Sequence, residues 1–453
     1  MSDDTIAAIA TAKGSSAIAI VRISGSEVLS IGRKVLSWHT PDLKPWKMMH
    51  SSFIDPDTQE TIDDVLFCYM KAPSSYTGED MLEIFCHGGN LPPQSILEVI
   101  IKNGARQAKA GEFTRRALEH GKMDLIQAEF IQQIAKAQSR KELQLSLKNI
   151  KGHLSDFVHQ LISGIQEYLV WAEAVISFPD HIEFDVPIQP LLQTWQSTIR
   201  YLCDQYERSQ FLMSGFHIAI VGKTNVGKST LFNSLSEKNR SLVSPYASTT
   251  HDYIEEMILW SGNPIHLYDT AGWVDEPNPI DMLCQDQTHD IIKKSSLILL
   301  VVDVSDPISL DPKYVHDILA HYSHKTWIIV NKNDLTQGIP MNWREIIPAY
   351  IPIHSISAST KTGLDLLKKE ILEYLPLDKI ADLNCLVNER WYQVFEQARL
   401  SFDHIAEMPD PNAYLDMVVA ELKQIQLLLT EQLGYNLNEG LYQQIFDRFC
   451  IGK

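Results

Sequence analysis

The spacing of hydrophobic residues changes along the chain, and the first pattern is an alternation. From residue 1 to about 120, short segments with alternating apolar and polar positions lie between turns, namely TIAAIAT, AIAIVRISG, DDVLFCYM and DMLEIFCHGG. This period is typical of strands that bury one face. Pro73, followed by Ser74 and Ser75, indicates a loop. These segments therefore predict an α+β domain.

A helical period replaces the alternation from about residue 124 to 178. Apolar residues recur there at steps of three and four without an intervening proline: Ile150, Leu154, Phe157, Leu161, Ile165 and Leu169. Pro179, Pro187 and Pro190 end this stretch, and a second helical stretch follows from 191 to about 212. A further stripe consists of Leu415, Val418, Leu422, Ile425, Leu429 and Leu433. The simplest interpretation is one helical domain split by an inserted domain.

The insertion has the pattern of an α/β domain, with apolar runs of strand length in HIAIV, PIHLY, LILLVV, TWIIV and YIPIHSI. The whole chain of 453 residues is long for a single core. We therefore expect a multidomain protein of the α/β plus α+β plus α class. The predicted divisions are an N-terminal domain (1–120), two parts of a helical domain (121–214 and 377–453) and a nucleotide domain (215–376).

The run GKTNVGKST, from Gly222 to Thr230, connects the strand-like HIAIV to the helix-like LFNSL. Gly222 and Gly227 let the backbone turn its N–H groups around a phosphate, and Lys228 would neutralise the β- and γ-phosphates. The Ser229 hydroxyl would bind Mg²⁺ at the start of the helix. A chance glycine loop is the alternative, but the flanking strand and helix favour nucleotide contacts from Asn225, Val226, Gly227, Lys228, Ser229 and Thr230.

The base is indicated about a hundred residues downstream, where TWIIV is followed by Asn331, Lys332, Asn333 and Asp334. The Asp334 carboxylate can accept two hydrogen bonds from guanine N1–H and N2–H₂, whereas adenine would leave it unpaired. Alone, such a polar run is typical of a turn. Together with the phosphate loop it indicates GTP. Ser357 and Ala358, after YIPIHSI, are a weaker match to a second base-contacting loop.

Two segments between these motifs are suited to sense the γ-phosphate: Ser248-Thr249-Thr250-His251-Asp252, and Asp269-Thr270-Ala271-Gly272 after PIHLY. Thr250 could complete the Mg²⁺ coordination, and Asp269 would hold a Mg²⁺-bound water. The Gly272 N–H would bond the γ-phosphate. Hydrolysis would then release both segments.

Composition narrows the classes of partner. The net charge of −18 argues against a protein that coats nucleic acid, so any RNA contact must be local. The best candidate is a basic segment, for which an ordinary solvated face is the alternative: Lys102, Arg106, Lys109, Arg115, Arg116 and Lys122. The longest apolar run, LILLVV, is too short to span a bilayer. The six cysteines show no C-x-x-C pair or zinc spacing, so we expect a cytoplasmic protein.

Longer motifs make a resemblance specific. DTIAAIAT with VRISG, SYTGEDMLEIFCHGG, GEFTRRALEHGKMDLIQAE, the nucleotide motifs and the terminal CIGK follow one another in this order. Over essentially the whole chain, they resemble the MnmE family, also called TrmE, of tRNA uridine-modification GTPases. The resemblance implies a homodimer with an N-terminal folate-binding domain, a split helical domain and an inserted Ras-like P-loop GTPase domain.

The resemblance also implies a reaction. Such proteins work with an FAD-dependent partner, as a heterotetramer, to add a carboxymethylaminomethyl group to C5 of the wobble uridine, position 34, in certain tRNAs. The one-carbon unit comes from 5-formyl- or 5,10-methylene-tetrahydrofolate. By position, Arg22, Glu79, Lys122 and Lys453 would contact the folate, although each alone would be taken for a surface charge. Cys450 is a candidate nucleophile or a partly buried small hydrophobe.

The implied hydrolytic site is unusual. Ras-like GTPases position the attacking water with a glutamine directly after the DTAG motif, where this chain has Trp273. The family uses a glutamate in the following loop, and the aligned residue here is Asp281, with Glu276 as a fallback. Asp281 is one methylene shorter, a displacement of about 1.5 Å that could slow hydrolysis up to roughly a hundredfold. An ordinary loop acid is the alternative for Asp281.

The family also replaces the arginine finger with K⁺, held by the phosphate-loop asparagine, here Asn225, and by a closing loop. That loop would provide nucleotide contacts from Ser244, Pro245, Tyr246, Ala247, Ser248, Thr249 and Thr250. Ser244, Tyr246 and Thr249 are the aligned oxygen donors to K⁺. Ser248 and His251 depart from the family's glycine and arginine, which restricts the loop backbone and removes a permanent charge.

The sequence leaves two functions open. The first is a K⁺-dependent GTPase whose nucleotide cycle drives domain closure during one-carbon transfer to tRNA. The second is a ribosome-assembly or other regulatory GTPase in which the N-terminal domain only docks. Saturable folate binding would distinguish them.

Overall fold

The computed structural model describes residues 4–12, 14, 16–37, 43–178, 187–236, 254–273, 279–306, 310, 312–336, 343–375, 380, 382–411, 413–434, 446, 449 and 452. For 279–286 and 344–345 it describes the backbone only. The chain divides into two compact units. Unit 1 comprises Met1–Lys136, Ser146–Arg200 and Gln393–Lys453, and unit 2 comprises Ala137–Leu145 and Tyr201–Tyr392.

The described strands of unit 1 form a six-stranded sheet in the order β3-β4-β5-β2-β1-β6. The strands are β1 (Ile6–Ile9), β2 (Ile18–Ser24), β3 (Met48–Ile54), β4 (Thr61–Met70), β5 (Met81–His87) and β6 (Arg106–Gln107). All neighbours are antiparallel except β1 and β6. The predicted strands are confirmed as β1, β2, β4 and β5. The sequence pattern did not predict β3, an edge strand with polar residues at its centre.

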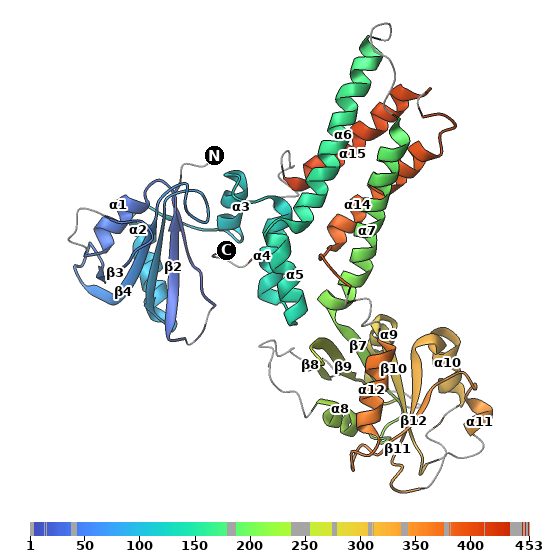
Figure 1. Ribbon diagram of the computed structural model, residues 1–453. Coiled ribbons are helices and arrows are strands. Elements are labelled where there is room, and N and C mark those ends of the chain that lie inside the picture. Colours follow the sequence, from blue (N-terminus) through green and yellow to red (C-terminus); the bar gives the residue numbers. More distant parts are fainter. Residues whose placement is uncertain are drawn as a thin grey trace. The chain divides into compact units, whose positions relative to one another are not determined.

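Helices cover both faces of this sheet. The main core lies on one face, where α1 (Val28–Val35) and α2 (Leu91–Lys102) pack on alternate residues of the strands. A smaller apolar cluster on the other face contains Ile6, Met81 and Phe113 of α3 (Glu112–Glu119). Figure 1 shows α1, α2 and the strands of this sheet in blue and α3 in teal. The predicted α+β fold of the N-terminal region is therefore confirmed.

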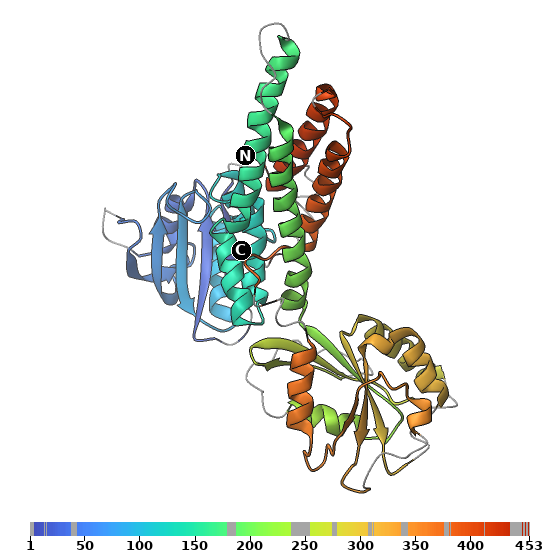
Figure 2. The ribbon, with the colours of Figure 1, turned by 45° about the vertical axis from the view of Figure 1, so that its right-hand side comes forward.

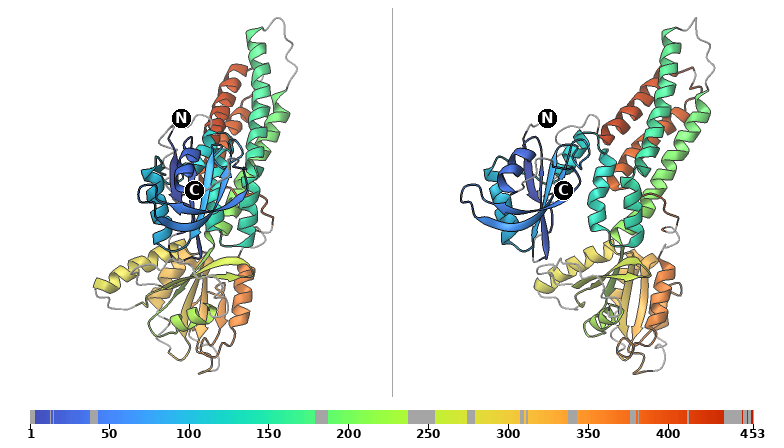
Figure 3. Two further views of the ribbon diagram at one scale, coloured as in Figure 1. Left: turned by 90° about the vertical axis from the view of Figure 1, so that its left-hand side faces the viewer. Right: turned by 60° about the vertical axis from the view of Figure 1, so that its left-hand side comes forward.

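The helical part of unit 1 joins segments that are far apart in the sequence. The helices are α4 (Leu125–Lys136), α5 (Arg140–Ile150), α6 (His153–Ser177), α7 (Ile188–Ser214), α14 (Glu389–Ala406) and α15 (Leu415–Leu433), of which α5, α7 and α14 continue into unit 2. α15 lies beside α6 (Figure 3). Trp195 and Phe402 pack with ring centroids 5.8 Å apart. This confirms a helical domain built from two parts of the chain.

Unit 2 contains a second sheet with six described strands, in the order β12-β11-β10-β7-β9-β8. Its strands are β7 (Phe216–Val221), β8 (Ile254–Trp260), β9 (Asn263–Asp269), β10 (Leu297–Asp303), β11 (Thr326–Asn331) and β12 (Ile353–Ser355). Only β8 pairs antiparallel among these strands. The strands predicted from HIAIV, PIHLY, LILLVV, TWIIV and YIPIHSI are confirmed as β7, β9, β10, β11 and β12.

Helices pack on both faces of this second sheet (Figure 2). One face carries α9 (Pro279–Lys294), α10 (Pro312–Tyr322) and the short α11 (Trp343–Ile346), which share a core with the strands. The helices α8 (Lys228–Ser236) and α12 (Leu364–Tyr374) complete the domain. Because the strands are mostly parallel, the loops after β7, β9, β10 and β11 meet at one edge of the sheet. Among the residues described, no helix is both long and apolar enough to cross a membrane.

Candidate functional site

The loop between β7 and α8 has the backbone of a tight phosphate cradle. Gly222 has φ +149°, and a Cβ there would lie 2.4 Å from the carbonyl oxygen of Val301. Gly227 has φ +98°, and a Cβ there would lie 2.3 Å from Asn331 Nδ2. Neither position can take a side chain. Asn225 also has a positive φ, 63°, which non-glycine residues adopt rarely.

Lys228 opens α8 and places its ammonium inside this loop. Its side chain is buried, and Nζ donates a hydrogen bond of 2.9 Å to the carbonyl oxygen of Lys223. Burial lowers the Lys228 pKa, while the negative charge of Asp269 opposes this shift. The ammonium therefore lies in a desolvated position where a phosphate would be a strong partner.

Asp269, at the end of β9, supplies the acidic part of the site. It is buried, and its Oδ1 has no hydrogen-bond partner among the described residues. Buried carboxylate oxygens are seldom left unpaired. The Ser229 hydroxyl in the first turn of α8 fits the all-oxygen ligand set of Mg²⁺, and the unpaired Asp269 Oδ1 fits a water bound to that ion.

The segment after Asp269 packs tightly on the phosphate loop. A Cβ at Gly272 would lie 2.6 Å from Thr224 Cγ2 and 3.0 Å from Lys228 Nζ. Thr270 anchors the segment, because its Oγ1 donates to the carbonyl oxygen of Ile220 at 2.9 Å. Trp273 N donates to the carbonyl oxygen of Gly222 at 3.1 Å. The Trp273 ring stacks on Tyr314, with centroids 4.6 Å apart.

The segment after β11 is tied to the phosphate loop by side chains. Asn331 is buried, donates from Nδ2 to the carbonyl oxygen of Val226 at 2.9 Å, and accepts from the backbone N of Ala358 at 2.9 Å. Lys332 Nζ donates to the carbonyl oxygen of Asn225 at 3.1 Å and to Asp303 Oδ2 at 2.5 Å. Asp303, at the end of β10, was not singled out from the sequence.

The two remaining base-site residues differ in exposure. Asp334 is exposed, so its carboxylate is open to a ligand. Ser357 is buried, and its hydroxyl accepts from the backbone N of Thr360 at 3.3 Å, which closes the turn after β12. Ala358 is likewise buried beside Asn331.

Several predicted residues lie outside the described part of the chain. These are Ser244, Pro245, Tyr246, Ala247, Ser248, Thr249, Thr250 and His251, the fallback Glu276, and Cys450 and Lys453. Asp281 lies in α9, but its side chain is not described.

In unit 1 the residues predicted to contact folate take part in internal contacts. Arg22, on β2, pairs with Glu83 on β5, with Nη2 and Oε1 2.7 Å apart. Its Nη1 donates to the carbonyl oxygen of Gly452 at 3.2 Å, which ties this glycine to the sheet. Lys122 is exposed, and its Nζ donates to the carbonyl oxygen of Pro73 at 2.9 Å.

Glu79 belongs to a network centred on Arg116. Arg116 is only 4% exposed, and its guanidinium lies 3.1 Å from Glu79, 2.8 Å from Asp4 and 3.4 Å from Glu112. Ser24 Oγ donates to Glu79 Oε2 at 2.6 Å. Arg116 is therefore not a solvent-exposed cation of the basic segment expected from the sequence. The sequence pattern missed this because two of its carboxylate partners, Glu79 and Asp4, are distant in the sequence. Arg106 joins the network, and its hydrogen bond to Glu112 raises its pKa.

Comparisons with known proteins bear on both units. A family profile described as "GTP-binding protein TrmE N-terminus" matches residues 5–122, and one described as "MnmE helical domain" matches residues 125–450. A protein of Desulforamulus reducens named "tRNA modification GTPase MnmE" is 33% identical over 100% of both chains. A protein of the same name from Alkaliphilus metalliredigens is 34% identical over 100% of this chain and 99% of its own. The solved G domain of the T. maritima FeoB iron transporter has 25% identity over 35% of this chain and 98% of its own, with a TM-score of 0.29.

Proposed function

Because the chain belongs to the MnmE family of tRNA modification GTPases, as its motifs predict, we propose that GTP hydrolysis at the β7–α8 loop drives carboxymethylaminomethylation of C5 of the wobble uridine, position 34, in certain tRNAs. A tetrahydrofolate would provide the one-carbon unit. The protein would act as a homodimer, and with an FAD-dependent partner as a heterotetramer. Family membership supports GTP hydrolysis in tRNA modification. The carboxymethylaminomethylation of the wobble uridine, the homodimer and the FAD-dependent partner are what we propose.

The buried charges of Lys228 and Asp269 carry the nucleotide part of this proposal. Lys228 would exchange its hydrogen bond to the carbonyl oxygen of Lys223 for the β- and γ-phosphates, a stronger charge-assisted partner. The Ser229 hydroxyl would bind Mg²⁺ with Thr250 as a further ligand, and the unpaired Asp269 Oδ1 would hold a Mg²⁺-bound water. Bound Mg²⁺ neutralises charge on the phosphates. Gly272 would donate its N–H to the γ-phosphate.

Base recognition would be coupled to phosphate binding by two anchored side chains. Asn331 and Lys332 each bind a backbone carbonyl of the phosphate loop, at Val226 and Asn225. Asp334, exposed at the end of the same segment, would accept hydrogen bonds from guanine N1–H and N2–H₂. Ser357 and Ala358 would close the base site on its other side.

Hydrolysis would depend on groups other than the residue after the DTAG motif. The Trp273 ring stacks on Tyr314 and its indole N–H can only donate, so it cannot accept a hydrogen bond from the attacking water as a glutamine carbonyl would. Asp281, on α9, would do so, and K⁺ bound by Asn225, Ser244, Tyr246 and Thr249 would provide the charge of an arginine finger. Asn225 is exposed in the phosphate loop, which supports this role. GTP turnover should be faster in KCl than in NaCl, and equal rates would exclude K⁺ dependence.

Folate would bind near Arg22 on β2, an interior strand of the first sheet. Arg22 and Lys453 would be opposite charges for the cofactor's glutamate carboxylates, with Lys122 nearby, and Glu79 would accept from pterin N–H groups. The contact between Arg22 and the carbonyl oxygen of Gly452 supports a pocket that includes the C-terminal segment. The full chain should bind 5-formyltetrahydrofolate saturably, and Arg22→Gln should weaken binding more than Arg33→Gln, a change on α1.

The decisive experiment is a nucleoside analysis of tRNA from cells that lack the protein. We expect the 5-carboxymethylaminomethyl modification to disappear and to return with the wild-type gene. A Lys228→Met gene should fail to restore it. Unchanged wobble uridines in the deletion strain would exclude the proposed reaction and leave a regulatory GTPase.

A further inference from the structure

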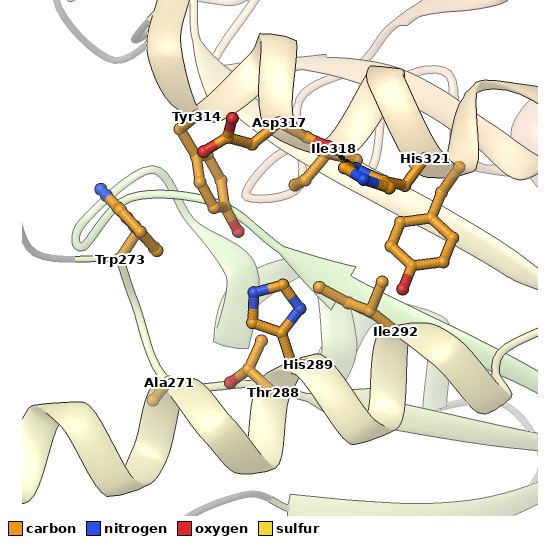
Figure 4. Close-up of a pocket in the computed structure, with 10 residues that line it drawn as sticks. Ala271, Trp273, Thr288, His289, Ile292, Tyr314, Asp317, Ile318 and His321 are labelled. Carbon is orange, nitrogen blue, oxygen red and sulfur yellow. Dashed lines mark hydrogen bonds between the residues drawn. The ribbon is translucent and has the colours of Figure 1, made fainter.

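Unit 2 contains a cavity whose described lining shares one residue, Ala271, with the segments that would bind the nucleotide. It has a volume of about 410 Å³ and lies between α9 and α10, beside the segment that follows β9. This volume is within the range of small-molecule sites. Figure 4 shows Trp273 and Tyr314 together at one end, with His289 projecting from α9 and Asp317 from α10.

Aromatic rings dominate the walls of this cavity. Trp273 and Tyr314 stack at 4.6 Å with an interplanar angle of 29°, and Tyr322, His289 and His321 also line it. Burial raises the pKa of Tyr314, so its hydroxyl stays protonated. Walls of this kind favour a flat aromatic ligand, which can stack on them or meet their edges.

The charge of the lining selects among aromatic ligands. Asp317 is the acidic side chain among the described lining residues, and none of these is lysine or arginine. The nearby Lys325 lies with Nζ 5.0 Å from the centre of the Tyr322 ring, but its ammonium donates to the carbonyl oxygens of Ile292, Lys293 and Ser295. A cationic nitrogen on the ligand would pair with Asp317 and interact with the ring faces.

The cavity is connected to the phosphate loop through one residue. Trp273 forms part of its wall, and the backbone N of Trp273 donates to the carbonyl oxygen of Gly222. Its neighbour Gly272 leaves no room for a Cβ against Thr224 and Lys228. A ligand stacked on Trp273 would restrain this segment against the loop, and binding of a γ-phosphate beside Lys228 would have to work against that restraint.

We propose that the cavity between α9 and α10 is a regulatory site for a small planar aromatic cation, whose binding slows GTP hydrolysis through Trp273. This inference rests on the nucleotide site proposed above. Coupling between two sites is typically 5–150-fold, so we expect saturating ligand to reduce GTP turnover by about fivefold or more. The nucleotide should weaken ligand binding by a similar factor, because such coupling is reciprocal.

The test uses three indole probes that differ in charge: tryptamine, indole and indole-3-acetate. Calorimetric titration of the full chain should give saturable binding of tryptamine and at least about tenfold weaker binding of indole-3-acetate. Asp317→Asn should remove this preference, whereas Asp365→Asn, on α12, should keep it. Tryptamine should slow GTP turnover in the wild type and much less in Asp317→Asn.

Three results would overturn the proposal. They are no saturable binding of any probe, equal affinity for the cation and the anion, and tryptamine binding that leaves GTP turnover unchanged. GTP turnover without probes provides a separate readout of the nucleotide site, because Asp317 is not part of it. Normal basal turnover with no probe binding would therefore reject the regulatory site alone, and absent basal turnover would instead count against the nucleotide site.

Discussion

The two sheets of this protein each contain six described strands, but they build their candidate sites differently. In unit 2 the parallel strands place four loops at one edge, and backbone groups, glycines and one buried lysine form the site there. In unit 1 most neighbours are antiparallel, so no common edge collects the loops. Its candidate site consists instead of charged side chains from distant parts of the chain, around Arg22 and Arg116.

This difference predicts different responses to mutation. Arg116 has three carboxylate partners and is almost inaccessible to solvent, so its loss would remove the cation that pairs with the partly buried Glu79. Lys228 is also buried, but the hydrogen bond that its ammonium donates goes to the carbonyl oxygen of Lys223. Substitution of Arg116 should therefore reduce the stability of unit 1, and substitution of Lys228 should mainly reduce the activity of unit 2.

The largest effect is expected for Arg116→Gln. Removing one member of a buried ion network costs about 3–5 kcal/mol, so the thermal transition of unit 1 should fall strongly. The matched control is Arg115→Gln, because Arg115 is 44% exposed and pairs with Glu119 on the same helix. Such a surface pair contributes about 1 kcal/mol or less.

Calorimetry can assign the two transitions, because GTP raises only the transition of the unit that binds it. Arg116→Gln should lower the transition that GTP does not protect. Equal shifts for the two arginine variants, or a shift confined to the GTP-protected transition, would contradict the contrast between the sheets.

The next effect concerns the phosphate loop. Lys228→Met should reduce the kcat of GTP hydrolysis by about 10²–10³, the loss typical of removing one group that stabilises a transition state. Because burial already disfavours the charged ammonium, a methionine of similar length should leave the stability of unit 2 unchanged or higher. Lys369→Met, at an exposed position on α12, is the control for turnover. A large fall in the melting temperature of unit 2 would show that Lys228 is chiefly structural.

The sequence predicted the fold correctly where a local hydrophobic pattern corresponds to a single strand of the structure. The strands β7, β9, β10 and β11 are short and largely buried, and the apolar run of β7 ends before Gly222 while the other three strands end on a polar residue, Asp269, Asp303 and Asn331. The same runs place the nucleotide motifs at strand ends, so both the fold and much of the candidate site in unit 2 could be predicted. β3 could not, because His50, Ser51 and Ser52 interrupt its alternation at the sheet edge.

Contacts between distant side chains were not predictable from these patterns. Arg116 looked like one cation in a basic segment, yet its partners Asp4 and Glu79 lie 112 and 37 residues away. Asp303 ends the apolar strand β10. Its pairing with Lys332 depends on the sheet order, which places β10 beside β11. No local period encodes such pairs, because pairing follows from tertiary structure.

A smaller effect is expected where the C-terminal segment meets the first sheet. Gly452 has φ +97°, and a Cβ there would lie 2.5 Å from the carbonyl oxygen of Ile9. Gly452→Ala should therefore weaken this contact by about 1–3 kcal/mol. Gly104→Ala is the control, because Gly104 has φ +119° but an added Cβ there would have no heavy atom of the described residues within 4 Å.

Carboxypeptidase digestion should measure this change, because a loosened C-terminal segment is cut faster. Gly452→Ala should be digested faster than Gly104→Ala at equal GTP turnover. Identical digestion rates would mean that the close approach to Ile9 does not hold the segment.

The smallest effect concerns pH, and the two sheets should respond with opposite signs. In unit 2, burial and the neighbouring His266 lower the pKa of His217, whose Nδ1 lies 2.8 Å from the Tyr268 hydroxyl. The unfolded chain then binds more protons than the folded unit below pH 6.5, so stability falls as pH drops through the folded pKa. In unit 1, the hydrogen bond to Asp63 raises the pKa of His87. The contribution of this hydrogen bond to the stability of unit 1 is complete below pH 6.5 and disappears as pH rises through the folded pKa of His87.

Acidification from about pH 7.5 to 5.5 should therefore lower the melting transition of unit 2 relative to that of unit 1. His217→Gln removes the titrating group but keeps a polar side chain, so it should reduce this difference, and His50→Gln, at an exposed position of β3, should not. His87→Gln should act on the other transition only, by removing the stabilisation of unit 1 at low pH. The contradicting result is that both transitions move in parallel with pH in the wild type and in all three variants. The opposite environments of His217 and His87 would then have no thermodynamic consequence. The contrast between the sheets would be limited to their charged networks.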